Sequence, residues 1–173
     1  MELLHAVATR RSIRHFTPDP VPVADIVAIL EAGRFAPSGR NSQPWRFLVV
    51  RGDDPRRETL CAHTKYARIL REAAFAVAVF LDREAAYDPV KDHQGIGACL
   101  QNMLLAAHAL GLGAVWIGEI INQEPAVTRA LGLDADRYAL MAVVAAGHPA
   151  RPGKSARRPL EELLLEPLHG DEA

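Results

Sequence analysis

The sequence has little of several features that mark common protein classes. It contains only two cysteines, Cys61 and Cys99, and they lack CxxC spacing, so neither a disulfide framework nor a zinc ribbon is indicated. The longest apolar run, Ala73 to Leu81, is less than half of the roughly 20 residues that a membrane-spanning helix needs. Charged residues come early and no apolar stretch follows them, unlike in a secretory signal. These absences predict a reduced, cytoplasmic protein with no membrane partner.

A large charge excess is also missing. The 173 residues carry 20 basic and 21 acidic side chains, for a formal net charge of -1. Nucleic-acid and membrane-surface binders usually carry a basic excess, so these classes are excluded. The charge is nevertheless uneven, because Arg10, Arg11 and Arg14 cluster near one end and residues 151–158 hold a second basic group.

The motifs of several enzyme classes are absent. There is no GxxxxGK[ST], GxGxxG, HExxH or GxSxG, which argues against P-loop, Rossmann, zinc-protease and serine-hydrolase chemistry. Cys61 and His63 are the nearest approach to a metal pair, but residues i and i+2 do not share one face of a helix. We therefore expect no metal and no catalytic side chain that forms a covalent intermediate.

Length and patterning predict one domain over residues 1–173, in which residues 166–173 form a short C-terminal tail. Apolar spacing, prolines and glycines predict helices over Val23–Phe35, Pro55–Arg71, Asp92–Leu110 with Asp92 as N-cap, and Pro159–Leu165. Strands are predicted over Trp45–Val50, Ala73–Leu81, Ala114–Ile117 and Leu140–Ala146. This alternation favours a three-layer α/β/α arrangement around a mixed sheet.

The two basic clusters are candidate anion sites. Arg10, Arg11, Ser12 and Arg14 combine three cations with a hydroxyl group, which suits a phosphate monoester because guanidinium groups match phosphate oxygens. Lys154, Arg157 and Arg158 form the second patch. A solvated basic turn is the alternative interpretation of either cluster.

Two uncharged segments suit a flat polar ligand. Residues 36–45 place small, amide and hydroxyl groups between two prolines, which would present donors at fixed positions. Asn41 and Gln43 could instead tie this loop to its own backbone. Residues 111–119 combine glycines with Trp116 and Ile117 and would admit a ring, although a buried strand would have the same pattern.

Together these segments resemble the FMN-dependent nitroreductase family. The resemblance covers about residues 4–165 in the order of the family. It rests on residues 10–16 (RRSIRHF), the APSxxNxQPW loop, residues 101–107 (QNMLLAA) leading to Gly111-Leu112-Gly113, Trp116-Ile117-Gly118, and Gly147-His148-Pro149 followed by Lys154, Arg157 and residues 159–162 (PLEE). It implies an α+β fold with a mixed, mainly antiparallel central sheet flanked by helices.

The resemblance also implies a homodimer with two FMN molecules at the subunit interface. One chain would contribute a phosphate- and ribityl-binding group and one flavin face, with a backbone N–H near Gly118 directed at flavin N5. These residues are Arg10, Arg11, Ser12, Arg14, Lys154, Arg157, Trp116, Ile117 and Gly118. The partner chain would contribute Pro37, Ser38, Gly39 and Asn41, where Gly39 stands in place of a second serine found in many members.

The implied activity is that of an FMN-dependent NAD(P)H oxidoreductase. NADH or NADPH would donate hydride to flavin N5, and nitroaromatic, quinone or related acceptors would be reduced in a ping-pong sequence. Because the flavin carries the chemistry, no catalytic side chain is expected. Residues 83–91 leave little room for the helical insertion of longer members, which predicts an open site and a permissive acceptor range.

Two alternatives remain at this point. The chain could belong to a specialised branch of the same fold, which performs flavin fragmentation, dehalogenation or enone reduction. It could also be a flavin- or phosphometabolite-binding module without turnover. Reduction of bound flavin by a nicotinamide separates the oxidoreductase from the binding module.

Overall fold

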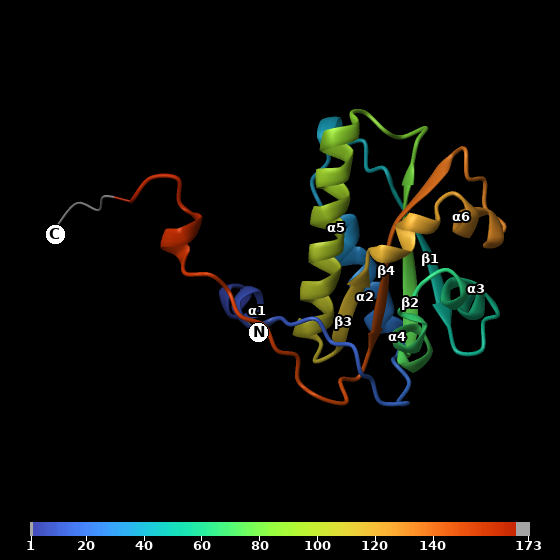
Figure 1. Cartoon of the computed structure of the whole chain (residues 1–173), viewed down its shortest axis with the longest axis horizontal. Coiled ribbons are helices and arrows are strands. Elements are labelled where there is room, and N and C mark those ends of the chain that lie inside the picture. The colour runs from blue at the N-terminus through green and yellow to red at the C-terminus, as the bar shows by residue number, and fades with distance from the viewer. Residues whose placement is uncertain (1, 169–173) are drawn as a thin grey trace.

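The computed structural model describes residues 2–168 and has three layers, with helices on both faces of one sheet (Figure 1). The strands are β1 (Trp45–Arg51), β2 (Phe75–Asp82), β3 (Gly113–Ile117) and β4 (Tyr138–Gly147). They are ordered β1-β2-β4-β3, and all neighbours are antiparallel. A parallel bridge between Ser12 and Ala114 lies outside these strands. The fold class is confirmed, and the parallel component is this bridge.

Helices α2 (Val23–Arg34) and α5 (Pro89–Ala109) cover one face of the sheet. Helices α3 (Arg56–Ala62), α4 (Ala67–Glu72) and α6 (Ala126–Ala130) cover the other. The remaining elements are α1 (Leu3–Thr9) and the 3₁₀ helices η1 (Gly39–Asn41), η2 (Glu119–Gln123) and η3 (Leu160–Leu163). No helix within residues 2–168 is long and apolar enough to cross a membrane.

Strand β2 separates the two halves of the hydrophobic core. All eight of its residues are buried, because successive side chains point to opposite faces and each face is covered by helices. Val77 packs in the cluster beneath α2 and α5, whereas Ala78 packs in the cluster beneath α3, α4 and α6. The predicted buried central strand is confirmed.

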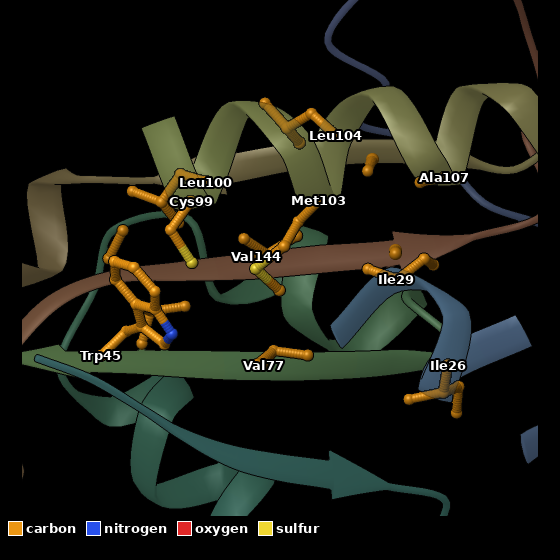
Figure 2. Close-up of a cluster of buried hydrophobic side chains, with 14 of the residues drawn as sticks. Ile26, Ile29, Trp45, Val77, Cys99, Leu100, Met103, Leu104, Ala107 and Val144 are labelled. Atoms are coloured by element: carbon orange, nitrogen blue, oxygen red, sulfur yellow. The ribbon is translucent and has the colours of Figure 1, made fainter. Parts of the chain in front are cut away.

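Helix α5 is the long packed helix that the apolar spacing predicted. Its stripe contacts α2 and the sheet (Figure 2). Gly33 of α2 permits the close approach, since a Cβ there would lie 2.8 Å from Cγ of Met103. Burying a side chain such as that of Met103 contributes about 1.5–3 kcal/mol, so the close approach at Gly33 helps to stabilise this layer.

Three helix predictions need correction. The helix expected over residues 55–71 is two helices, because residues 63–66 form a turn in which Thr64 Oγ donates to Glu119 Oε2 at 2.6 Å. Asp88 rather than Asp92 is the N-cap of α5 and accepts from the Lys91 N–H at 3.0 Å. The C-terminal helix is the exposed 3₁₀ turn η3, without buried residues to stabilise a full helix. The predicted tail, residues 166–173, lies largely outside the described residues.

Candidate functional site

The two basic clusters meet beside the start of β3, although more than 130 residues separate them along the chain. The Ile13 N–H donates to the Ala114 carbonyl at 3.0 Å, and the Ala150 N–H donates to the His15 carbonyl at 3.0 Å. Gly153 lies against the N-terminal segment so closely that a Cβ there would be 2.6 Å from Cβ of Arg11. Residues 10–16 and 147–153 therefore run side by side.

Arg10 carries the clearest electrostatic signal of this region. Its Nη1 atom is buried and has no hydrogen-bond partner within residues 2–168. Burial lowers the pKa of Arg10, and the nearby charges of Arg157 and Arg11 lower it further. A partly buried cation beside two like charges is stabilised when an anion neutralises it. The arrangement fits an anionic ligand.

Ser12, Arg14 and Lys154 line a cavity of about 210 Å³ beside this cluster. Arg151 borders the same cavity. The structure thus brings residues from both basic clusters to one hollow, and guanidinium, ammonium and hydroxyl donors together suit phosphate oxygens.

The Arg11 side chain, unlike those of its neighbours in the basic cluster, binds backbone carbonyls. Its Nη1 atom donates to the carbonyls of Ala8 at 2.7 Å and Arg10 at 2.9 Å, which satisfies carbonyls at the end of α1. Arg11 also lines a separate cavity of about 550 Å³ together with His108. Its guanidinium is therefore a helix cap, and the structure does not place it in the cavity of Ser12 and Arg14.

The end of β3 forms a second hollow that adjoins the first at Arg14. Trp116, Ile117 and Gly118 line this cavity of about 210 Å³ with Arg14. Trp116 is 47% exposed on the edge strand, whereas the Ile117 side chain is buried in the core. Among the described residues other than its two chain neighbours, no atom lies within 4 Å of a Cβ placed on Gly118, so a flat ring could approach the backbone there.

Sequence reasoning missed two residues that line this hollow, Tyr66 and Ile69, whereas Glu119 is the last residue of the candidate segment 111–119. Tyr66 belongs to the turn before α4, which the expected continuous helix concealed. The hydrogen bond between Thr64 and Glu119 holds the turn beside the end of β3. This tertiary contact has no local sequence signal.

Pro37, Ser38, Gly39 and Asn41 lie at the opposite end of α5. Gly95 packs near the first turns of α5 against this loop, since a Cβ there would be 3.3 Å from the Pro37 carbonyl oxygen. At the other end of α5, His108 Nε2 lies 2.9 Å from Thr9 Oγ, beside the basic cluster. At 1.5 Å per residue, Gly95 and His108 are about 20 Å apart. Within one chain, the loop is thus remote from the basic cluster.

The loop holds a defined conformation. Arg40, Asn41 and Gln43 have φ angles of 53°, 56° and 48°, in the left-handed region that is unfavourable for residues with a Cβ. Ser38 Oγ accepts from the Gln43 N–H at 3.0 Å, and Gln43 Nε2 donates to the Asn41 carbonyl at 3.2 Å. Gln43 therefore ties the loop to its own backbone, as one interpretation expected. No hydrogen bond of the Asn41 side chain occurs within residues 2–168.

Gly39 has a steric reason for replacing a serine. A Cβ at this position would lie 2.7 Å from Cδ1 of Tyr87. The ring of Tyr87 thus takes the space that a side chain at residue 39 would need.

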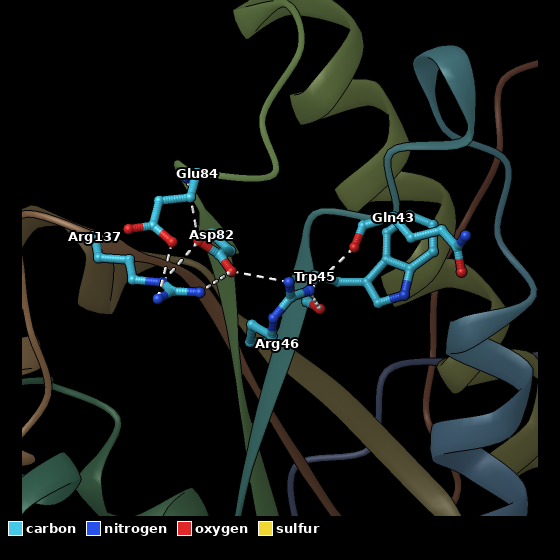
Figure 3. Close-up of polar contacts among 6 residues, drawn as sticks. All are labelled: Gln43, Trp45, Arg46, Asp82, Glu84 and Arg137. Atoms are coloured by element: carbon cyan, nitrogen blue, oxygen red, sulfur yellow. Dashed lines mark hydrogen bonds and ion pairs between the residues drawn. The ribbon is translucent and has the colours of Figure 1, made fainter.

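A buried carboxylate anchors this end of the sheet (Figure 3). Asp82 is fully buried and pairs with Arg137 at 3.0 Å and Arg46 at 2.8 Å. Hydrogen bonds from Arg137 lower the pKa of Asp82. Arg46 in turn donates to the Gln43 carbonyl at 3.1 Å, which connects the buried carboxylate to the loop.

Comparison with known proteins gives a consistent result. The nitroreductase family model matches residues 7–67 and 55–148. An Archaeoglobus fulgidus protein described as an NADH dehydrogenase/NAD(P)H nitroreductase is 35% identical over 86% of each chain. The 5,6-dimethylbenzimidazole synthase of Rhodospirillum rubrum is 33% identical over 87% of each chain. A Desulfovibrio desulfuricans protein described as a nitroreductase, solved in complex with FMN, superposes with a TM-score of 0.96 at 57% identity, covering 98% of this chain and 99% of the other.

Proposed function

The chain belongs to the nitroreductase family, and on that premise we propose that it is an FMN-dependent NAD(P)H oxidoreductase that reduces nitroaromatic, quinone or related acceptors. The observation that carries the proposal is the buried Arg10 Nη1 atom, which has no partner within residues 2–168 and faces added repulsion from Arg157. An anion bound here would neutralise that charge, as the phosphate of FMN can.

The residues fit the two parts of FMN. Arg10, Ser12, Lys154 and Arg157 would hold the phosphate, since charge-assisted hydrogen bonds to phosphate are strong. Arg14 borders both hollows and would contact the ring. When bound, FMN would supply the redox chemistry, namely hydride transfer from NADH or NADPH to an acceptor.

The protein's own contribution is binding and shielding. Trp116 and the backbone at Gly118 would cover one face of the ring and exclude water from it, while Gly118 leaves room for close approach. Within residues 2–168 no cluster of three metal-ligating side chains occurs. No side-chain acid or base is assigned to hydride transfer.

We further propose a homodimer in which each site uses both chains. Pro37, Ser38, Gly39 and Asn41 are about 20 Å away along α5 from the basic cluster, so a second copy would have to supply them. Apolar side chains that need a partner are available on the surface, namely Leu3, Leu4 and Val7 of α1, Val23 and Val27 of α2, and Leu160, Leu163 and Leu165 of the C-terminal segment. Figure 1 shows that segment extending away from the sheet past α1.

The connection between β2 and α5 supports an open site. It consists of residues 83–88 and contains no helix. Nothing in this connection could cover a flavin as a long insertion would, so a permissive acceptor range is expected.

The test is the absorption spectrum of the purified protein, followed by anaerobic addition of NADH or NADPH. Bound FMN that bleaches with either nicotinamide supports the proposal. A protein that does not take up FMN would refute it, and bound FMN that neither nicotinamide reduces would favour a binding module.

The synthase relative makes a specialised branch the second candidate. Aerobic incubation with FMN and NADPH, followed by mass spectrometry, distinguishes the two. Formation of 5,6-dimethylbenzimidazole would favour the specialised branch, whereas reduced acceptor without this product would favour the oxidoreductase.

A further inference from the structure

Two cations lie on one aromatic ring at the N-terminal end of α5. The guanidinium carbon of Arg40 is 4.3 Å from the Tyr87 ring centroid, and Lys91 Nζ is 5.0 Å from it. Within residues 2–168 neither cation forms an ion pair. By contrast, Arg34 also lies on an aromatic ring, but it is paired with Glu31.

The backbone positions of these three residues are set by their surroundings. Tyr87 packs directly against Gly39, and its N–H donates to the buried Asp92 carboxylate at 2.8 Å. Lys91 lies in the first turn of α5, and Arg40 lies in η1 with a positive φ angle. The ring remains 38% exposed, so it can still contact a ligand.

The neighbourhood of Tyr87 has room for an aromatic ligand. Tyr87 also lines a cavity of about 450 Å³, whose walls combine apolar side chains such as Leu81 and Met141 with the charged residues Arg83, Asp88 and Asp92. Arg40 and Lys91 do not line this cavity but lie on the Tyr87 ring. An aromatic side chain with two cations that form no ion pair within residues 2–168 suits a ring bearing a negative charge.

We propose that Arg40, Tyr87 and Lys91 form a wall of the partner subunit's acceptor site and favour aromatic acceptors that carry an anionic substituent, such as a carboxylate. This inference rests on the proposed function, because the loop from Pro37 to Asn41 must reach the partner's flavin. The cations attract the charged substituent, while the part of Tyr87 that they leave exposed contacts the acceptor ring. Neutral acceptors still bind, but Arg40 and Lys91 add no electrostatic attraction to their binding.

The first experiment compares an isosteric pair of acceptors, 4-nitrobenzoate and 4-nitrobenzamide, with the FMN-loaded enzyme. R40Q and K91Q should each lower kcat/KM for the anion about three-fold, and the double variant about ten-fold. For the amide, kcat/KM should change less than two-fold. The loss of kcat/KM for the anion in the variants should become smaller as salt is added, because exposed charges are screened. The matched control is R129Q, an exposed arginine on α6, which should affect neither acceptor.

A binding measurement separates this inference from the proposed function. Benzoate and benzamide, which are not reduced, are titrated into oxidised enzyme while the flavin absorbance is followed. Weaker benzoate binding in the double variant supports the proposed role of Arg40 and Lys91, even if nicotinamides fail to reduce the flavin. Equal benzoate binding in wild type and double variant would show that Arg40 and Lys91 do not bind the anionic substituent, even if the flavin is reduced normally.

A mixed dimer tests whether the wall acts on the partner's site. One chain carries R10A and R157A, which should abolish FMN binding at its own phosphate site, and the other carries R40Q and K91Q. If the wall acts across the interface, the surviving flavin has an intact wall and prefers 4-nitrobenzoate as wild type does. Loss of that preference in the mixed dimer would place the wall in the site of its own chain and contradict the inference.

Discussion

The two ends of α5 differ in how their charges are balanced. At the C-terminal end, Arg10 lies beside Arg11 and Arg157, and its buried Nη1 atom has no partner within residues 2–168. At the N-terminal end, the buried Asp82 is neutralised by Arg46 and Arg137. The charges at the C-terminal end are not neutralised without an anion. Those at the N-terminal end neutralise each other and hold the loop at residues 37–41 in place.

This difference teaches how to separate a ligand site from a framework, since both contain shifted pKa values. A perturbed group whose partners are all present in the protein indicates structure, whereas a perturbed group with only like charges around it indicates a missing ligand. The following substitutions test that distinction, beginning with the largest expected effect.

D82N should be the most destabilising change. It removes a buried charge, leaves Arg46 without its counter-ion and leaves Arg137 with only Glu84. Breaking a buried pair typically costs about 3 kcal/mol or more. We expect the free energy of unfolding, measured with urea, to fall by about 2–3 kcal/mol because both arginines are partly exposed. A loss below about 0.5 kcal/mol would mean that the pair is not a framework element.

The same carboxylate predicts a pH dependence. The pKa of Asp82 is lowered on folding, so its stabilisation is complete above the ordinary aspartate pKa and is lost as pH falls through the folded-state pKa. The stability difference between wild type and D82N should therefore narrow as pH is lowered from 7 to 3. Urea midpoints across this range provide the measurement, and a constant difference would contradict the assignment.

R10A should act on ligand binding rather than on the framework. Loss of one charge-assisted hydrogen bond should weaken FMN binding by at least ~1.5 kcal/mol, or roughly ten-fold, in a fluorescence titration. The FMN-free protein should keep its stability, because the substitution relieves repulsion with Arg157. R129Q is the control. Unchanged FMN affinity would show that Arg10 is not a phosphate ligand.

G39S should produce the smallest effect. Its Cβ would lie 2.7 Å from the Tyr87 ring, and such overpacking typically costs about 1–3 kcal/mol; we expect about 1 kcal/mol at this exposed loop. The double variant G39S/Y87A should recover most of the loss in urea unfolding. Failure of the double variant to recover would show that the backbone, and not Tyr87, requires glycine.

Periodicity predicted the framework well. The apolar spacing of α5 and the continuous apolar run of β2 reflect burial that repeats along the chain, and such repetition is readable locally. The exceptions depend on single long-range contacts. The break between α3 and α4 depends on Glu119, and the choice of Asp88 over Asp92 as N-cap depends on which carboxylate is buried.

The candidate site likewise has features that the sequence predicted and features that depend on long-range contacts. The basic residues, the glycine-containing strand end and the family resemblance were evident from the residues themselves. The different use of Arg11, the contribution of Tyr66 and the wall formed by Arg40, Tyr87 and Lys91 were not. Each of these depends on which side chains meet across distant segments, which spacing along the chain does not encode.

The sequence by itself determined the kind of protein, because it contains both the motifs that resemble the nitroreductase family and the apolar patterning that specifies the helices and strands. Only the tertiary structure decided that residues 10–16 and 147–153 lie together, and that the loop at residues 37–41 lies about 20 Å away at the other end of α5. The physical reason is that α5 is packed against the sheet and α2 along its length. Its two ends therefore hold the basic cluster and the loop at residues 37–41 at a fixed distance within one chain.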